Sequence, residues 1–232
     1  MKKNLLWMLA AILACGASVL SACSDDMADN PVVVEQVAYS VNGISDCNGQ
    51  MVYLMNMTNE KTIDSVKIVD GKFSFSGLLD KDAMMGIGLN KFEVNCWITL
   101  FFNDGTPVTA NLNDSTLVGS PLNTCLSYYD IEVYRPYFNL QRKVMAMSEE
   151  EIAAKEEEIM EALNQIDEDI TAMVNQIFID ERNTLIPLAF AIDYFYGNGI
   201  EAYDKLIEEG VIFANHPYLK YARDKVAAMY AE

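Results

Sequence analysis

The sequence predicts an α+β protein in which an N-terminal antiparallel β-sandwich is followed by an all-helical C-terminal region. Two observations carry this prediction. Short alternating apolar and polar segments separated by turn residues occupy 36–118, and capping residues with helical spacing take over in 119–232. The composition is globular, because 51% of the 232 residues are hydrophobic and 22% are charged. The formal charge of −18 argues against binding to nucleic acid or to an anionic membrane surface.

The turns define the strand region. Asp70-Gly71 separates the alternating segments 66–69 and 72–75, and this pair is a strong hairpin signal because both turn positions need a positive φ. A second turn at 103–105 separates apolar segments on either side of it. Many short strands divided by such turns are typical of a β-sandwich.

Capping residues mark where the helices begin. Ser120 followed by Pro121 predicts a helix start, and Pro136 is expected to kink or end that helix. Ser148 and Glu151 form a capping box for a second helix, in which 149–182 contains no Gly or Pro. Its apolar residues follow a heptad pattern: Ile152, Ile159, Leu163, Ile166, Ile170, Met173 and Ile177. We expect this apolar seam to pack on the Ser120 helix of the same chain, although a partner is the alternative.

Three shorter helices are expected after the second one. Thr184 caps a helix that ends at Gly197, 200–209 forms another that Gly210 stops, and Asn215 with Pro217 begins the last.

Residues 1–22 have the features of a lipoprotein signal peptide. A basic start is followed by a short apolar run at 5–13 and by the string LSAC at 20–23, which resembles a bacterial lipobox. Cys23 is then the lipidation site and the first mature residue; an ordinary secretory signal cleaved nearby is the alternative. Residues 23–35 are expected to form an acidic tether, and SDD at 24–26 resembles the surface-export signal of Bacteroidota lipoproteins. We therefore expect an outer membrane lipoprotein that faces the periplasm or the cell surface.

The sequence contains no recognisable catalytic or metal-binding motif. The chain has five cysteines but no C-x-x-C pair, and Cys96 and Cys125 lie in apolar patterns that indicate buried filler. Cys47, in a polar turn, is the candidate reactive thiol. His216 is the only histidine and begins a helix, which favours a capping role. We predict no catalytic residue, no metal and no cofactor.

Two surface features are candidates for modification or contact. Ser65, within Asp64-Ser65-Val66, resembles the O-glycosylation site of exported Bacteroidota proteins. Tyr134 and Tyr137 flank Pro136 and are candidate partner contacts if they are exposed, with core packing as the alternative.

Several short strings in order resemble a known family. They are VNG at 41–43, MVYL at 51–54, IDSV at 63–66, DGKFSFSG at 70–77 and VGSPLN at 118–123. Together they resemble the domain of unknown function that precedes thioredoxin-like domains in Bacteroidota thiol–disulfide oxidoreductase lipoproteins. The Trp-Cys-x-x-Cys of the thioredoxin-like part is absent from this sequence. The resemblance therefore implies a fold and a compartment but no catalytic residue.

These observations favour a non-catalytic exported lipoprotein that acts as a binding or scaffold module of the cell envelope. Its expected partners are the membrane, through the lipid on Cys23, and an envelope protein or a glycan. One alternative is an accessory module of a redox system that works with a separate thioredoxin-like protein, or through Cys47 alone. A hydrolase that uses clustered carboxylates is the remaining alternative, and it needs two carboxyl groups facing one cleft.

Overall fold

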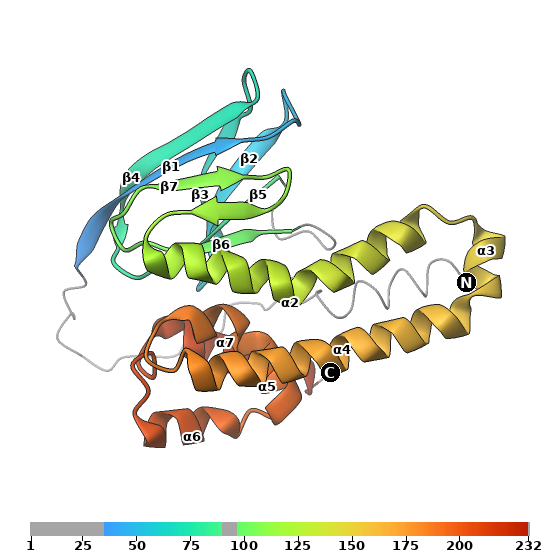
Figure 1. The fold of residues 1–232 in the computed structure, drawn as a ribbon. Coiled ribbons are helices and arrows are strands. Elements are labelled where there is room, and N and C mark those ends of the chain that lie inside the picture. The colour runs from blue at the N-terminus through green and yellow to red at the C-terminus, as the bar shows by residue number, and fades with distance from the viewer. Residues whose placement is uncertain (1–34, 90–96, 232) are drawn as a thin grey trace.

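The computed structural model describes residues 35–89 and 97–231, which form two β-sheets and a helical region beside them (Figure 1). Sheet A has the strand order β4-β1-β7-β8, and sheet B has the order β3-β2-β5-β6. The strands are β1 (Gln36–Ile44), β2 (Met51–Asn56), β3 (Lys61–Lys67), β4 (Lys72–Asp80), β5 (Met84–Gly88), β6 (Thr99–Phe102), β7 (Val108–Asn111) and β8 (Thr116–Val118). The predicted α+β class, with strands before helices, is confirmed.

The two sheets face each other across a shared apolar core. Alternate residues of β1 and β4 point inward, so that Val41 and Phe75 are buried while Asn42 and Ser74 are exposed. They meet Leu54, Ile87 and Phe101 of sheet B in one cluster. Sheet B is antiparallel, but sheet A contains one parallel pair, β1 with β7, and is therefore mixed.

The Asp70-Gly71 turn has the predicted backbone geometry but joins two different sheets. Both residues have positive φ, 52° for Asp70 and 71° for Gly71. Beyond the turn only Val69 and Lys72 form a bridge, because β3 pairs with β2 while β4 pairs with β1 along its whole length. Strand β3 forms more backbone pairs with β2, and β4 more with β1, than β3 and β4 form with each other. The two strands on either side of the turn therefore do not form the expected two-stranded hairpin.

The helical region consists of α2 (Pro121–Met145), α3 (Glu149–Ala154), α4 (Glu156–Asp180), the 3₁₀ helix η1 (Ile186–Phe190), α5 (Ala191–Asn198), α6 (Ala202–Glu209) and α7 (Pro217–Met229). Helices α2 and α4 lie side by side, and α3 connects them at the end far from the sheets (Figure 1). Within 35–89 and 97–231, no helix has both the length and the apolar character needed to cross a bilayer.

Two expectations for the long helices need correction. The prediction that Pro136 could end the first helix is wrong, because α2 continues to Met145 and buries Tyr137 and Val144 beyond the proline. The second helix is not continuous: Lys155, with φ −116° and ψ 15°, separates α3 from α4. Because of this break, the Ile152 side chain packs in the same apolar cluster as Tyr137 and Val144.

The seam of α4 packs within the chain, as expected. Ile159 and Leu163 join the cluster around Tyr137, while Ile170 and Ile177 join the main helical core. The capping box is present, with both the Ser148 and the Glu151 side chains bonded to backbone amides. The helix predicted from Thr184 begins instead as η1 and continues as α5, which ends at Asn198 with Gly199 as its C-cap, rather than at Gly197.

The start of α2 is built into the edges of both sheets. The Asn123 side chain accepts a hydrogen bond from the Phe102 amide at 2.8 Å and donates one to the Phe102 carbonyl at 2.9 Å. The Ser127 hydroxyl accepts a bond from the Leu117 amide at 2.8 Å. Because β6 and β8 are edge strands, the helix supplies bonds that a further strand would otherwise provide.

The helices cover the outer face of sheet B. Every residue of β5 and β6 is buried, and Met84, Leu100 and Phe102 belong to the helical core. In sheet A, by contrast, the outward-facing residues Asn42, Ser74 and Thr109 are exposed. An open sheet face and a buried junction are therefore the two places to look for a functional site.

Candidate functional site

The junction between sheet B and the helices contains buried acids. The Trp97 Nε1–H group donates to Asp130 Oδ2 at 2.8 Å, and the Trp97 ring stacks on Phe138 with centroids 4.6 Å apart. Asp130 is 3% exposed. Burial raises the pKa of Asp130 to about 7, the nearby Asp193 adds to the rise, and the bond from Trp97 opposes it. A carboxyl group that titrates near neutrality is thus held beneath the tryptophan.

A second acid, half-buried, lies beside a tyrosine. The Tyr134 hydroxyl donates to Asp193 Oδ2, and burial raises the pKa of both groups. Burial also raises the pKa of Tyr218 on α7, with a further contribution from the negative charge of Asp193. The Asp193 side chain therefore contacts the phenol of Tyr134 and influences that of Tyr218 through its charge.

Helix α7 is fastened to two turns of the sandwich. Glu60, between β2 and β3, pairs with Lys225 and accepts a bond from the Tyr221 hydroxyl. Asp82, between β4 and β5, presents its carbonyl to His216 Nε2 at 3.0 Å. Glu60 and Asp82 are both non-glycine residues with positive φ, 53° and 62°, a left-handed conformation that is uncommon for such residues outside turns. Helix α7 therefore contacts the sandwich at two tight turns.

His216 acts as a helix cap, as the sequence predicts. Its Nδ1 accepts a bond from the Tyr218 amide at 3.1 Å, so the ring proton is assigned to Nε2, which donates to the Asp82 carbonyl. Burial lowers the pKa of His216, so the ring is neutral at pH 7. Both nitrogens are already engaged.

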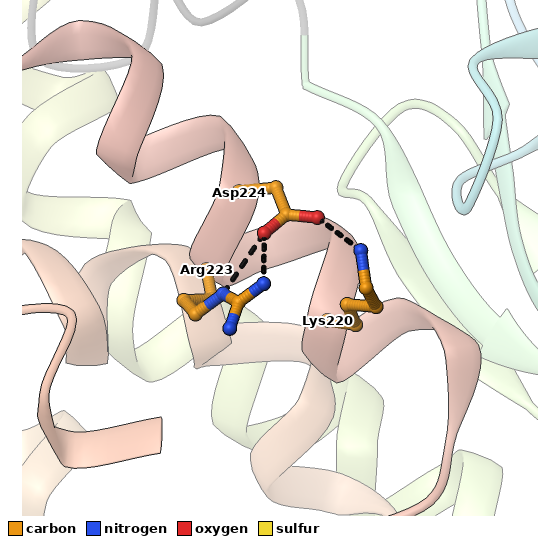
Figure 2. Close-up of polar contacts among 3 residues, drawn as sticks. All are labelled: Lys220, Arg223 and Asp224. Atoms are coloured by element: carbon orange, nitrogen blue, oxygen red, sulfur yellow. Dashed lines mark hydrogen bonds and ion pairs between the residues drawn. The ribbon is translucent and has the colours of Figure 1, made fainter. Parts of the chain in front are cut away.

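The remaining cations of α7 are also paired. Figure 2 shows Lys220 and Arg223 converging on Asp224, with Lys220 Nζ 2.6 Å from Oδ2 and Arg223 Nε 2.9 Å from Oδ1. The Arg223 guanidinium also lies over the Tyr203 ring, 4.6 Å from its centroid, and so ties α7 to α6. Although α7 is rich in Lys and Arg, these contacts use the charges within the protein.

The outer face of sheet A carries a groove of about 570 Å³, here called the sheet A groove. Its side chains come from four strands: Asn42, Ile44, Lys67, Lys72, Ser74 and Thr109, with Gly43, Val66 and Phe73 beside them. Ser74, Asn42 and Thr109 are register neighbours on β4, β1 and β7, so they form one row across the sheet. Lys67 at the end of β3 and Lys72 at the start of β4 place one end of the groove beside the turn that joins these strands.

The polar side chains of the sheet A groove are available to bind a ligand. Among the described residues, none of Asn42, Lys67, Lys72, Ser74 and Thr109 makes a side-chain hydrogen bond or an ion pair. No acidic residue belongs to the described lining. In a chain of net charge −18, the groove is thus a local region of positive charge and free hydrogen-bonding groups.

Comparison with known families identifies one domain in the chain. Residues 39–126 match a family described as a domain of unknown function, DUF4369. The chain contains a DUF4369 domain. No curated protein and no solved structure shows significant similarity to the chain. The DUF4369 match includes every residue that lines the sheet A groove. It also extends into α2 past Asn123, whose side chain is hydrogen-bonded to the backbone of Phe102 in edge strand β6.

The other predicted site residues do not gather at one place. Cys47 is half-buried at the margin of the DUF4369 core, and Cys125 is half-buried in α2; both are free thiols, and burial raises the pKa of Cys125. Ser65 is exposed on β3, so the glycosylation site stays a prediction. Cys23 and Cys96 lie outside the described residues. Within the described chain, no group of three or more His, Cys, Asp or Glu is placed to hold a metal ion.

Tyr134 and Tyr137 do not meet the condition of exposure set for a partner contact. Tyr137 is 1% exposed, and Tyr134 is half-buried between Phe190 and Asp193. Packing of α2 against α4 and η1 covers most of both rings. The exposed tyrosines are instead Tyr128, Tyr196 and Tyr230, at 61–65% exposure.

Sequence reasoning missed the buried acids and the groove. A signal for the acids was present, because Asp130 shares a helical face with Leu126 and Tyr134, and Asp193 is the one charge within 186–195. The groove had no comparable local signal, since its row of side chains depends on strand pairing.

Proposed function

We propose that the chain is an exported lipoprotein, anchored in the outer membrane through Cys23, which acts as a non-catalytic binding module of the cell envelope. The sheet A groove is its binding site. The observation that carries this proposal is the set of unengaged polar side chains in a groove of about 570 Å³, a volume typical of small-ligand sites.

The junction supports a scaffold role for the rest of the molecule. Asp130, which is buried, and Asp193, which is half-buried, are each bonded to a neighbouring ring group, and His216 is engaged at both nitrogens. These contacts hold the helices on the DUF4369 domain and leave the groove on the opposite sheet accessible.

The test combines lipid labelling with crosslinking in cells. Labelled palmitate should be incorporated, and Cys23→Ser should abolish it. A photocrosslinking amino acid at Thr109 in the groove should trap a ligand or partner, whereas the same group at Tyr196, 65% exposed on α5, should not. Equal trapping at both positions, or at neither, would refute the groove as the binding site.

The same cells can distinguish the binding proposal from the redox alternative. Capture under non-reducing conditions is repeated with Cys47→Ala. The binding proposal expects the trapped species to be indifferent to this change. A thioredoxin-like partner that disappears with Cys47→Ala would instead establish an accessory redox role.

A further inference from the structure

The charge of the sheet A groove is opposite in sign to the net charge of the chain. Lys67, at the end of β3, and Lys72, at the start of β4, flank the Asp70-Gly71 turn and both line the groove. Neither has a carboxylate within ion-pairing distance among the described residues, whereas Lys220, Arg223 and Lys225 on α7 all do. The groove cations are thus left without internal counterions in a chain that has 34 acids and 16 basic residues.

The row beside these lysines offers neutral hydrogen-bonding groups. Ser74, Asn42 and Thr109 lie on neighbouring strands, so their side chains are spaced at about 4.8 Å across the sheet. A hydroxyl, an amide and a second hydroxyl can each donate and accept. This pattern suits a ligand whose body carries several hydroxyl groups.

The exposed surface of the groove is largely apolar, although most of the side chains that line it carry a polar group. Ile44 is 45% exposed and stands one row from Asn42, while the Phe73 ring is buried beneath Gly43. The Phe73 Cζ atom would lie 2.0 Å from a Cβ on Gly43, so the ring fills the space under the strand rather than facing the groove. No aromatic face is presented for stacking a nucleobase, but Ile44 can cover the C–H face of a sugar ring.

We propose that the sheet A groove binds an acidic saccharide, with Lys67 and Lys72 pairing with its carboxylate or sulfate and the Ser74–Asn42–Thr109 row bonding its hydroxyls. This inference rests on the proposed function, since it names the ligand class of that site. The chain as a whole is acidic and repels such a ligand, whereas the two lysines of the groove attract it locally.

The experiment is a calorimetric titration of the purified full chain with three probes. Tri-galacturonate is the acidic saccharide, its methyl ester is the same body without charge, and tri-glutamate carries the charge on a peptide. Tri-galacturonate should bind at least about tenfold more tightly than either of the others, and its affinity should fall with added salt.

Matched variants locate the binding. Lys67→Gln with Lys72→Gln should weaken tri-galacturonate binding by about tenfold or more. Lys61→Gln with Lys205→Gln removes the same charge from exposed lysines outside the groove, and Lys61 is about 20 Å from Lys67 along β3. This control pair should bind normally. Far-UV circular dichroism confirms that both pairs are folded.

Three results would overturn the inference. If the methyl ester binds as tightly as tri-galacturonate, the charge of the ligand does not contribute to binding. If tri-glutamate binds as tightly, the saccharide part of the ligand does not contribute. Failure of tri-galacturonate to bind would remove the ligand class outright. Each of these leaves the crosslinking result at Thr109 unaffected, so failure of the ligand class and failure of the binding module are distinguishable.

Discussion

Replacing Asp130 with asparagine should remove a pH-dependent cost to stability. Asp130 is 3% exposed, and burial raises its pKa from 3.8 to about 7. The folded state therefore holds this proton more tightly than the unfolded chain does. Its contribution is fully present below about pH 4 and is lost as the pH rises through about 7. A shift of about three units corresponds to about 4 kcal/mol at 1.36 kcal/mol per unit.

Asparagine keeps an oxygen for the Trp97 indole but adds an amide that needs a partner. An unsatisfied amide costs about 1–3 kcal/mol at every pH, so the absolute stability of Asp130→Asn is a poor readout. The informative quantity is the difference in unfolding free energy between the variant and the natural chain. We expect that difference to rise by about 3–4 kcal/mol in favour of the variant between about pH 4 and pH 8.

Urea denaturation followed by far-UV circular dichroism at several pH values measures this difference. Asp224→Asn is the control with the opposite sign. Burial of Asp224 opposes ionisation, but the bonds from Lys220 and Arg223 prevail and lower its pKa, so its contribution is lost as the pH falls. If Asp130→Asn and the natural chain give parallel stability curves from pH 4 to pH 8, the reasoning about burial is wrong.

Three further changes test the packing and the caps. Tyr137→Phe should leave stability unchanged or raise it by up to about 1 kcal/mol, because the buried hydroxyl has no partner in the described chain; a clear loss in urea denaturation would mean that it has one. Gly43→Ala should cost about 1–3 kcal/mol, since the new Cβ would collide with the Phe73 ring, and an unchanged melting temperature would contradict the tight contact. Ser148→Ala should cost about 1 kcal/mol in the same assay by removing the cap of α3, whereas Glu151→Gln, which keeps an acceptor, should cost less.

The features predicted correctly from the sequence are those fixed by near neighbours. Ser120 caps α2 through the amide of Asn123, His216 caps α7, and the Asp70-Gly71 turn has the expected dihedral angles. In each case the bonded groups are at most three residues apart, so the side-chain types in one short window determine the geometry.

The features that were not predicted depend on distant partners. Asp130 meets Trp97 from 33 positions away, and Tyr134 meets Asp193 from 59. The groove row requires both the antiparallel pairing of β1 with β4 and its parallel pairing with β7, and alternation within β1 cannot specify either. Pro136 misled because packing of α2 on α4 outweighs the single hydrogen bond that proline removes.

The hydrogen bonds between Asn123 and Phe102 determine where the chain can be cut to give a folded fragment. A fragment ending at Val118 would contain all eight strands, yet it would expose the Phe102 amide and carbonyl on the rim of one sheet and the Leu117 amide on the rim of the other. Bare strand rims of this kind recruit other chains and lead to aggregation. Keeping α2 through Ser127 would restore these bonds, but Met84, Leu100 and Phe102 on the outer face of sheet B would still be exposed, because the later helices cover them. The sheets and the helical region should therefore be expressed together as one folding unit.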